Sequence, residues 1–136
     1  MSETTNSTAK LPEITVTASE HARLTALAEH ALERNESAAT AERLLEELTR
    51  ARMVADDALP ADTIAVGREV DYYDQHSGRL HTVRLVNPPE ADINAGRISV
   101  LSPIGAALLG LSVGQCIDWP VPDGSLRRIE VRAVRA

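Results

Sequence analysis

The chain has 136 residues, of which 14 are Lys or Arg and 20 are Asp or Glu, so its formal net charge is −6. The segment up to Val54 carries 6 basic against 9 acidic side chains and the remainder carries 8 against 11, so neither half has the basic excess that binds a phosphate backbone. Aromatic residues make up 2% and Phe is missing, which argues against base stacking and predicts a core of Leu, Val, Ile and Ala.

Cysteine usage and the first residues indicate where the protein acts. Cys116 is the only cysteine and cannot form an internal disulfide, which fits a reducing compartment. The N-terminus lacks the apolar core of a signal peptide, and no stretch is apolar enough to span a membrane. We therefore expect a cytoplasmic protein that has no membrane partner and binds no specific DNA directly.

The first half predicts a disordered tail over residues 1–13 and a helical hairpin over residues 14–54. Thr17 and Glu20 have the spacing of a capping box, and apolar residues then recur at helical intervals to about Arg34. Residues 35–37 interrupt the pattern, and a second helix is expected over residues 38–53. Two such helices form an antiparallel hairpin, a short coiled coil.

The hairpin has a narrow apolar stripe. Its second helix places leucines and alanines on one side and charged residues, Glu47 among them, on the side expected to face water. Each arm of roughly 16 residues would be ~24 Å long. Because the stripe is too narrow for a full globular core, we expect the hairpin to project or to lean only partly on the rest.

After a linker over residues 55–62, which contains Pro60, the apolar period changes from helical to alternating. The second half, residues 63–136, therefore predicts a mostly antiparallel sheet with one short helix, and the fold class is α+β. Turns are expected at residues 74–78 and 122–124. The strands are expected at about Thr63–Val66, Glu69–Tyr73, Leu80–Val86, Arg97–Leu101, Cys116–Trp119 and Leu126–Val134.

The short helix is expected over Ile104–Leu109. Ser102 can cap it, Pro103 suits its first turn, and Gly110 ends it. A helix with so little polar surface must pack against something, and the face of the sheet is the obvious candidate.

The second half carries a series of motifs in a recognisable order. Val86-Asn-Pro-Pro-Glu-Ala-Asp92 is followed by Gly96-Arg-Ile-Ser-Val, Ser102-Pro-Ile, Ala106-Ala-Leu-Leu-Gly110 and Pro122-Asp-Gly124. In this series the chain resembles the C-terminal domain of the bacterial Gre transcript-cleavage factors, which has an FKBP-like fold. The form of Pro103–Leu111, the Leu59-Pro60 linker and the short helical arm are similar to the Rnk-like branch, named for the regulation of nucleoside diphosphate kinase.

The resemblance implies a partner and a contact site. Rnk-like proteins bind RNA polymerase near its secondary channel, compete with Gre factors and influence nucleoside diphosphate kinase indirectly. In Gre factors the loop equivalent to Leu101, Ser102 and Pro103 docks the domain on polymerase, and we extend the expected contact to Ile104. Leu101 stands where the family often has an acidic residue.

The hairpin tip is the second candidate site, at Glu33, Asn35 and Glu36. Gre factors stimulate transcript cleavage with paired acidic residues there, because carboxylate oxygens can hold Mg²⁺ in the polymerase active centre. The Gre tip motif itself is missing, and exposed glutamates are usually solvated surface. We therefore expect a non-enzymatic regulator without catalytic residues, and transcript cleavage is an alternative function.

The remaining candidates favour structural roles. His21 and His30 fall on opposite sides of one helix, and His76 and His81 flank a turn without the further ligands of a zinc site. Cys116 is expected to be a buried, inert thiol. An FKBP-like module that binds or isomerises another protein is a further alternative, although its pocket would need aromatic residues. We expect no metal and no cofactor.

Overall fold

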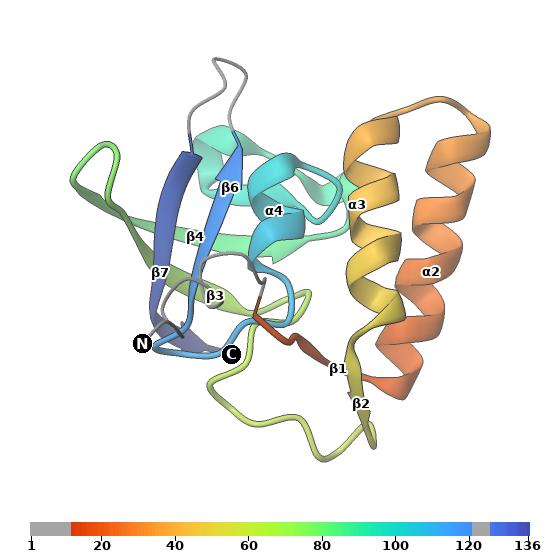
Figure 1. The fold of residues 1–136 in the computed structure, drawn as a ribbon, viewed down its shortest axis with the longest axis horizontal. Helices are drawn as coiled ribbons and strands as arrows, with labels where there is room; N and C mark the ends of the chain where they lie inside the picture. Colours follow the sequence, from red (N-terminus) through yellow and green to blue (C-terminus); the bar gives the residue numbers. More distant parts are fainter. Residues whose placement is uncertain (1–11, 121–125) are drawn as a thin grey trace, which may run out of the picture.

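The computed structural model describes residues 12–120 and 126–136. A helical hairpin lies beside a five-stranded sheet, and a short helix lies between them (Figure 1). This arrangement confirms the predicted α+β class. Most of the expected tail and the turn at residues 122–124 lie outside the described residues.

The first hairpin helix, α2 (Ala18–Glu33), begins as the sequence predicts. The Thr17 hydroxyl accepts a hydrogen bond from the Glu20 backbone N–H at 3.1 Å. The Glu20 carboxylate, however, does not return to Thr17 as a capping box requires. It accepts a hydrogen bond from the Val66 N–H at 3.2 Å, so this side chain connects the hairpin to the second half of the chain.

The second hairpin helix, α3 (Ala38–Thr49), ends four residues before the predicted boundary at Met53. Residues Arg52–Val54 form strand β2, which pairs in parallel with β1 (Thr15–Thr17). The Arg52 N–H donates to the Ile14 carbonyl at 2.8 Å. Because these backbone groups bond to the neighbouring strand, they cannot continue the helix. The small parallel sheet closes the foot of the hairpin.

The hairpin leans on the rest of the molecule instead of projecting from it. Helix α3 lies next to the short helix α4 (Pro103–Leu108), and α2 lies on the outer side (Figure 1). Leu24, Leu44 and Leu108 belong to one continuous hydrophobic cluster. The prediction that Glu47 faces water is wrong, because this residue is only 6% exposed and its carboxylate pairs with Arg50. The apolar stripe of the hairpin is therefore wide enough for its two helices to pack on each other and also on α4.

The main sheet has the strand order β5-β4-β3-β7-β6 and is antiparallel except where β4 pairs with β5. Its strands are β3 (Glu69–Asp74), β4 (Arg79–Val86), β5 (Arg97–Ser99), β6 (Cys116–Pro120) and β7 (Leu126–Arg135). Two 3-10 turns, η1 (Pro88–Glu90) and η2 (Ile93–Ala95), connect β4 to β5.

Two strand predictions need correction. The stretch 63–66 is no strand, since Thr63 makes a single isolated bridge with Ser112. The Ile64 backbone instead exchanges hydrogen bonds with the segment after α4, donating to the Leu111 carbonyl and accepting from the Gly110 N–H. Strand β5 ends at Ser99, two residues earlier than predicted, because the chain turns there into α4.

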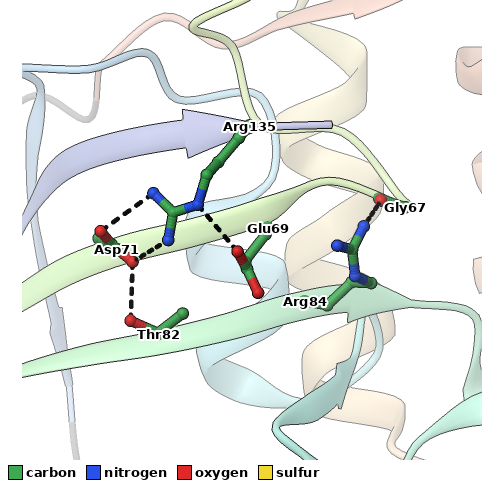
Figure 2. A network of polar contacts seen from close by, with 6 residues as sticks. All are labelled: Gly67, Glu69, Asp71, Thr82, Arg84 and Arg135. Carbon is green, nitrogen blue, oxygen red and sulfur yellow. Dashed lines mark hydrogen bonds and ion pairs between the residues drawn. The ribbon is translucent and has the colours of Figure 1, made fainter.

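The two faces of the sheet differ in polarity. Val70 and Leu85 are buried on the inner face. On the outer face Arg135 pairs with Glu69 and Asp71 (Figure 2). Hydrogen bonds from Arg135 and Thr82 hold the pKa of Asp71 below its ordinary value. The outer face is therefore occupied by internal polar contacts.

Candidate functional site

The turn between β5 and α4, which we name the corner (residues 101–104), is fixed by hydrogen bonds of two serines. The Ser102 hydroxyl donates to the Ser99 carbonyl at 2.6 Å and accepts from the Gly105 N–H at 3.1 Å. The Ser99 hydroxyl accepts from the Leu101 N–H at 2.9 Å. Ser102 thus caps α4 as predicted, and Pro103 occupies its first turn. Side-chain hydrogen bonds, and not only backbone ones, therefore define the shape of the corner.

Gly105 allows the corner to be this tight. A Cβ atom at this position would come within 2.0 Å of the Ser99 carbonyl oxygen. The chain of α4 therefore passes so close to the end of β5 that any side chain would displace it. Pro103 is exposed at the apex, and Leu101, Ser102 and Ile104 are half-buried around it.

An apolar cavity opens beside the corner, with a volume of about 260 Å³. It lies between the corner and the η2 turn, and Ile98, Ser102 and Ile104 contribute to its lining. Ile93 also lines it and is 81% exposed. An isoleucine this exposed beside a cavity extends the apolar surface of the corner.

Ile93 was missed by the reasoning from sequence. The available signal was a single large apolar residue within the turn-rich segment 92–96, where no strand or helix pattern requires one. Asp92 accepts a hydrogen bond from the Asn94 N–H and pairs with Arg97 at 3.5 Å. These contacts shape the turn that presents Ile93 to solvent.

The hairpin tip is exposed and is held mainly by its backbone. Glu33, Asn35 and Glu36 are all exposed, and Glu36 pairs with Arg34 at 3.5 Å. Asn35 and Ser37 have positive φ values of 54° and 49°. The tip and the beginning of α4 point toward the same end of the molecule (Figure 1). They belong to different elements and form two separate candidate contacts.

The histidines are dispersed over the fold. The His21 ring bonds to the Leu48 carbonyl across the hairpin at 2.9 Å, and the His81 ring stacks on Tyr72. His30 and His76 are exposed. Over residues 12–120 and 126–136, no three His, Cys, Asp or Glu side chains are grouped to hold a metal ion. Cys116 is half-buried, not buried as predicted.

Two buried carboxylates lie in the hairpin. Glu20 is 6% exposed, and burial raises its pKa above the ordinary value against the opposing effect of the Val66 N–H and Arg23. Burial likewise raises the pKa of Glu47, against the opposing effect of Arg50. Both residues are buried in the helices of the hairpin, so their contacts stabilise the hairpin and do not form a site on the surface.

Similarity to known proteins covers both halves of the chain. Residues 59–136 match the family model "Transcription elongation factor, GreA/GreB, C-term", and residues 12–54 match the model "Rnk N-terminus". None of the helices among the described residues is long and apolar enough to cross a membrane.

Individual relatives agree with these matches. The transcription elongation factor GreA of Rhodospirillum rubrum is 44% identical over 92 residues, which are 67% of this chain and 58% of that protein. The regulator of nucleoside diphosphate kinase of Escherichia coli K12 is 35% identical over 91 residues, 67% of each protein. The matched part thus spans little more than half of the GreA relative.

One solved structure of a relative has the same architecture. A transcription elongation factor GreA/GreB from Nitrosomonas europaea superposes with a TM-score of 0.69 and 29% identity, covering 92% of this chain and 99% of that one. The motif series that surrounds the corner lies within the matched C-terminal region. The chain belongs to the GreA/GreB transcription elongation factor family, with an N-terminal segment of the Rnk type.

Proposed function

We propose that this protein is a non-enzymatic transcription regulator that docks on RNA polymerase through the corner and Ile93. The observation that carries the proposal is the apolar surface at the corner, where an isoleucine that is 81% exposed adjoins a cavity of about 260 Å³. Protein interfaces typically have such an apolar centre with a polar rim, here supplied by Asp92 and Arg97.

The orientation of the hairpin supports docking near the secondary channel. The tip and the corner point toward the same end of the molecule, so a protein that holds the corner also faces the tip (Figure 1). Docking at this place gives a direct route to competition with Gre factors, and effects on nucleoside diphosphate kinase would follow from altered transcription. Such a factor acts in the cytoplasm, where the polymerase is.

The test is a competition assay with purified bacterial core polymerase. Wild-type protein is expected to bind and to displace a labelled Gre factor. Ile93→Asp should weaken binding by at least tenfold, because it places a charge in the lining of the apolar cavity. Pro103→Asn should also weaken binding, because it replaces the exposed apolar residue at the apex of the corner. Val113→Asp is the matched control, since Val113 is also exposed but does not line the cavity. Wild-type protein that does not bind at micromolar concentration would refute the proposal.

Transcript cleavage is the second candidate function, because Glu33 and Glu36 are exposed at the tip. Cleavage of the transcript in a stalled elongation complex, lost in the double variant Glu33→Ala, Glu36→Ala, would establish it. Cleavage that the double variant retains would come from another source.

A further inference from the structure

A second cavity, which we name the outer cavity, lies at the edge of the main sheet formed by β4 and β5 and has a volume of about 570 Å³. Arg84 and Arg97 line it from directly paired positions of these two strands. Arg84 stands opposite Glu69, so it belongs to the outer face of the sheet. Asp92 and Arg97 also line the apolar cavity beside the corner, so the two cavities adjoin each other.

Arg84 carries a positive charge that no carboxylate neutralises within the described ranges. Its neighbour across the strands, Glu69, pairs with Arg135 at 2.8 Å instead. The Arg84 guanidinium donates through Nη1 to the carbonyl oxygen of Gly67 (Figure 2). Both Arg84 and Gly67 line the outer cavity, so the guanidinium that joins them is part of its wall. A carbonyl partner leaves the full charge of the guanidinium in place.

The guanidinium of Arg84 is also accessible. Its Nε and Nη2 groups have no hydrogen-bond partner in the part of the chain that the structure describes, and neither belongs to the buried polar atoms without a partner. Arg84 as a whole is half-buried. These N–H groups are therefore open to solvent, and a ligand in the outer cavity can reach them.

The other lining residues indicate which anion fits. Asp92 pairs with Arg97 at 3.5 Å, and Glu90 adds a further negative charge to the lining. These carboxylates and the net charge of −6 repel a doubly charged phosphate more strongly than a single carboxylate. An arginine fork matches the two oxygens of a carboxylate. Val86 and Pro89 provide apolar wall for the carbon stem of an acidic side chain.

We propose that the outer cavity binds the carboxylate of an acidic side chain on the protein docked at the corner, with Arg84 as its ion-pair partner. The inference rests on the proposed docking function and adds a specificity-determining residue to it. Because the two cavities adjoin each other, an apolar side chain of the partner enters the apolar cavity while an acidic side chain beside it enters the outer cavity.

The first arm of the test measures polymerase binding at two salt concentrations. Arg84→Gln removes the charge and should weaken binding about fivefold at about 0.05 M KCl but less than about twofold at about 0.5 M, because salt screens an ion pair at the rim of an interface. Arg79→Gln is the matched control, because Arg79 is exposed on the same strand and does not line the outer cavity. Its effect should stay below about twofold at both concentrations.

The outcomes of this arm separate the two proposals. If Arg84→Gln binds as tightly as wild type at low salt, or if its loss of affinity does not shrink at high salt, the inference is overturned and the docking proposal stands. Wild-type protein that does not bind polymerase refutes the docking proposal, and the inference with it.

The second arm identifies the carboxylate. Arg84→Lys places a primary amine in the outer cavity of a chain whose only lysine is Lys10. In the complex with polymerase, a water-soluble carbodiimide activates carboxylates, and an amine in contact displaces the urea to form an amide. Mass spectrometry should find position 84 joined to an Asp or Glu of the polymerase, whereas Arg79→Lys should give no such link. Position 84 joined only to Glu90 of its own chain, or to nothing, would overturn the inference.

Discussion

Ser102 and Ser37 both stand directly before a helix, one at the corner and one at the hairpin tip. Ser102 has an extended backbone (φ −81°, ψ 156°), and its hydroxyl bonds to Gly105 and Ser99. Ser37 lies in the left-handed region (φ 49°, ψ 40°), and its side chain makes no capping hydrogen bond. A serine side chain thus fixes the shape of the corner through hydrogen bonds, whereas at the tip the serine only links the two helices.

This difference bears on how each region would bind a partner. A surface that already has its bound shape loses little conformational entropy on association. The corner meets that condition, since its serines and Gly105 set its geometry. At the tip, backbone hydrogen bonds such as Glu36 N–H to the Ala31 carbonyl at 2.9 Å provide the order, and two residues other than glycine have positive φ. The corner suits specific docking, and the tip suits adjustment after docking.

The largest effect is expected from breaking the corner itself. In Gly105→Ala, the new Cβ would lie 2.0 Å from the Ser99 carbonyl oxygen, so α4 must move away from β5. The free energy of unfolding should fall by about 3 kcal/mol, measured by urea denaturation.

Gly114→Ala is its control. Gly114 has a positive φ of 92°, but a Cβ there would meet nothing within 4 Å. This variant should lose only about 1 kcal/mol of backbone strain energy. Equal losses in the two variants would show that the close approach of α4 to β5 does not constrain the corner.

The comparison of the two serines is tested by substituting each of them. Ser102→Ala removes two hydrogen bonds of the corner and should lower the free energy of unfolding by about 1–2 kcal/mol. Ser37→Ala should change it by less than about 0.5 kcal/mol, because no side-chain bond is lost. Ser37→Gly should be slightly stabilising, since glycine accepts the left-handed backbone. Similar losses at both positions would contradict the distinction between a fixed corner and an adjustable tip.

The corner was largely predictable from sequence because its signals are local. Serine, proline and glycine at fixed offsets determine a cap, a first turn and a helix end, and α4 begins and ends within one residue of the prediction. The strands of the main sheet were also predictable, since alternating apolar residues mark them. The sequence motif likewise located the corner as a candidate docking site.

Features that depend on distant pairs were not predictable in this way. Strand β2 replaces the end of a predicted helix because β1 supplies its backbone hydrogen-bond partners. The paired residues Thr15 and Arg52 are 37 positions apart in the sequence. Glu20 has the spacing of a capping box, yet Val66 captures its carboxylate from across the fold. The exposure of Ile93 depends likewise on how η2 folds against the corner. A local sequence pattern carries no information about hydrogen-bond partners that come from distant parts of the chain.

Glu20 is one of the links between the hairpin and the second half of the chain. Its carboxylate joins the foot of the hairpin to the start of the sheet region through the Val66 N–H. One carboxylate oxygen, Oε1, is buried without a hydrogen-bond partner among the described residues. This contact therefore buries a negative charge that is only partly hydrogen-bonded, which destabilises the fold. A substitution can remove the charge and keep the hydrogen bond.

Glu20→Gln does this, and it is expected to stabilise the protein by about 1 kcal/mol at about pH 7. Burial raises the folded-state pKa of Glu20, so its protonated form favours folding. That stabilisation is fully present below the ordinary pKa of 4.5 and is lost as the pH rises through the raised folded-state pKa. Glutamine retains an oxygen acceptor for Val66 but does not ionise, so the difference between variant and wild type should grow from acidic to neutral pH.

The measurement is urea denaturation of both proteins at several pH values, with Glu29→Gln as the matched control. Glu29 is exposed on the same helix, so that variant should follow wild type at every pH. Glu47 contributes pH dependence of the same sign as Glu20, and Asp71, whose pKa is lowered, contributes the opposite sign. The effect of Glu20 is therefore given by the difference in free energy of unfolding between Glu20→Gln and wild type at each pH. A Glu20→Gln variant less stable than wild type at neutral pH would mean that the charge itself, through Arg23 and Arg68, holds the hairpin against the sheet region.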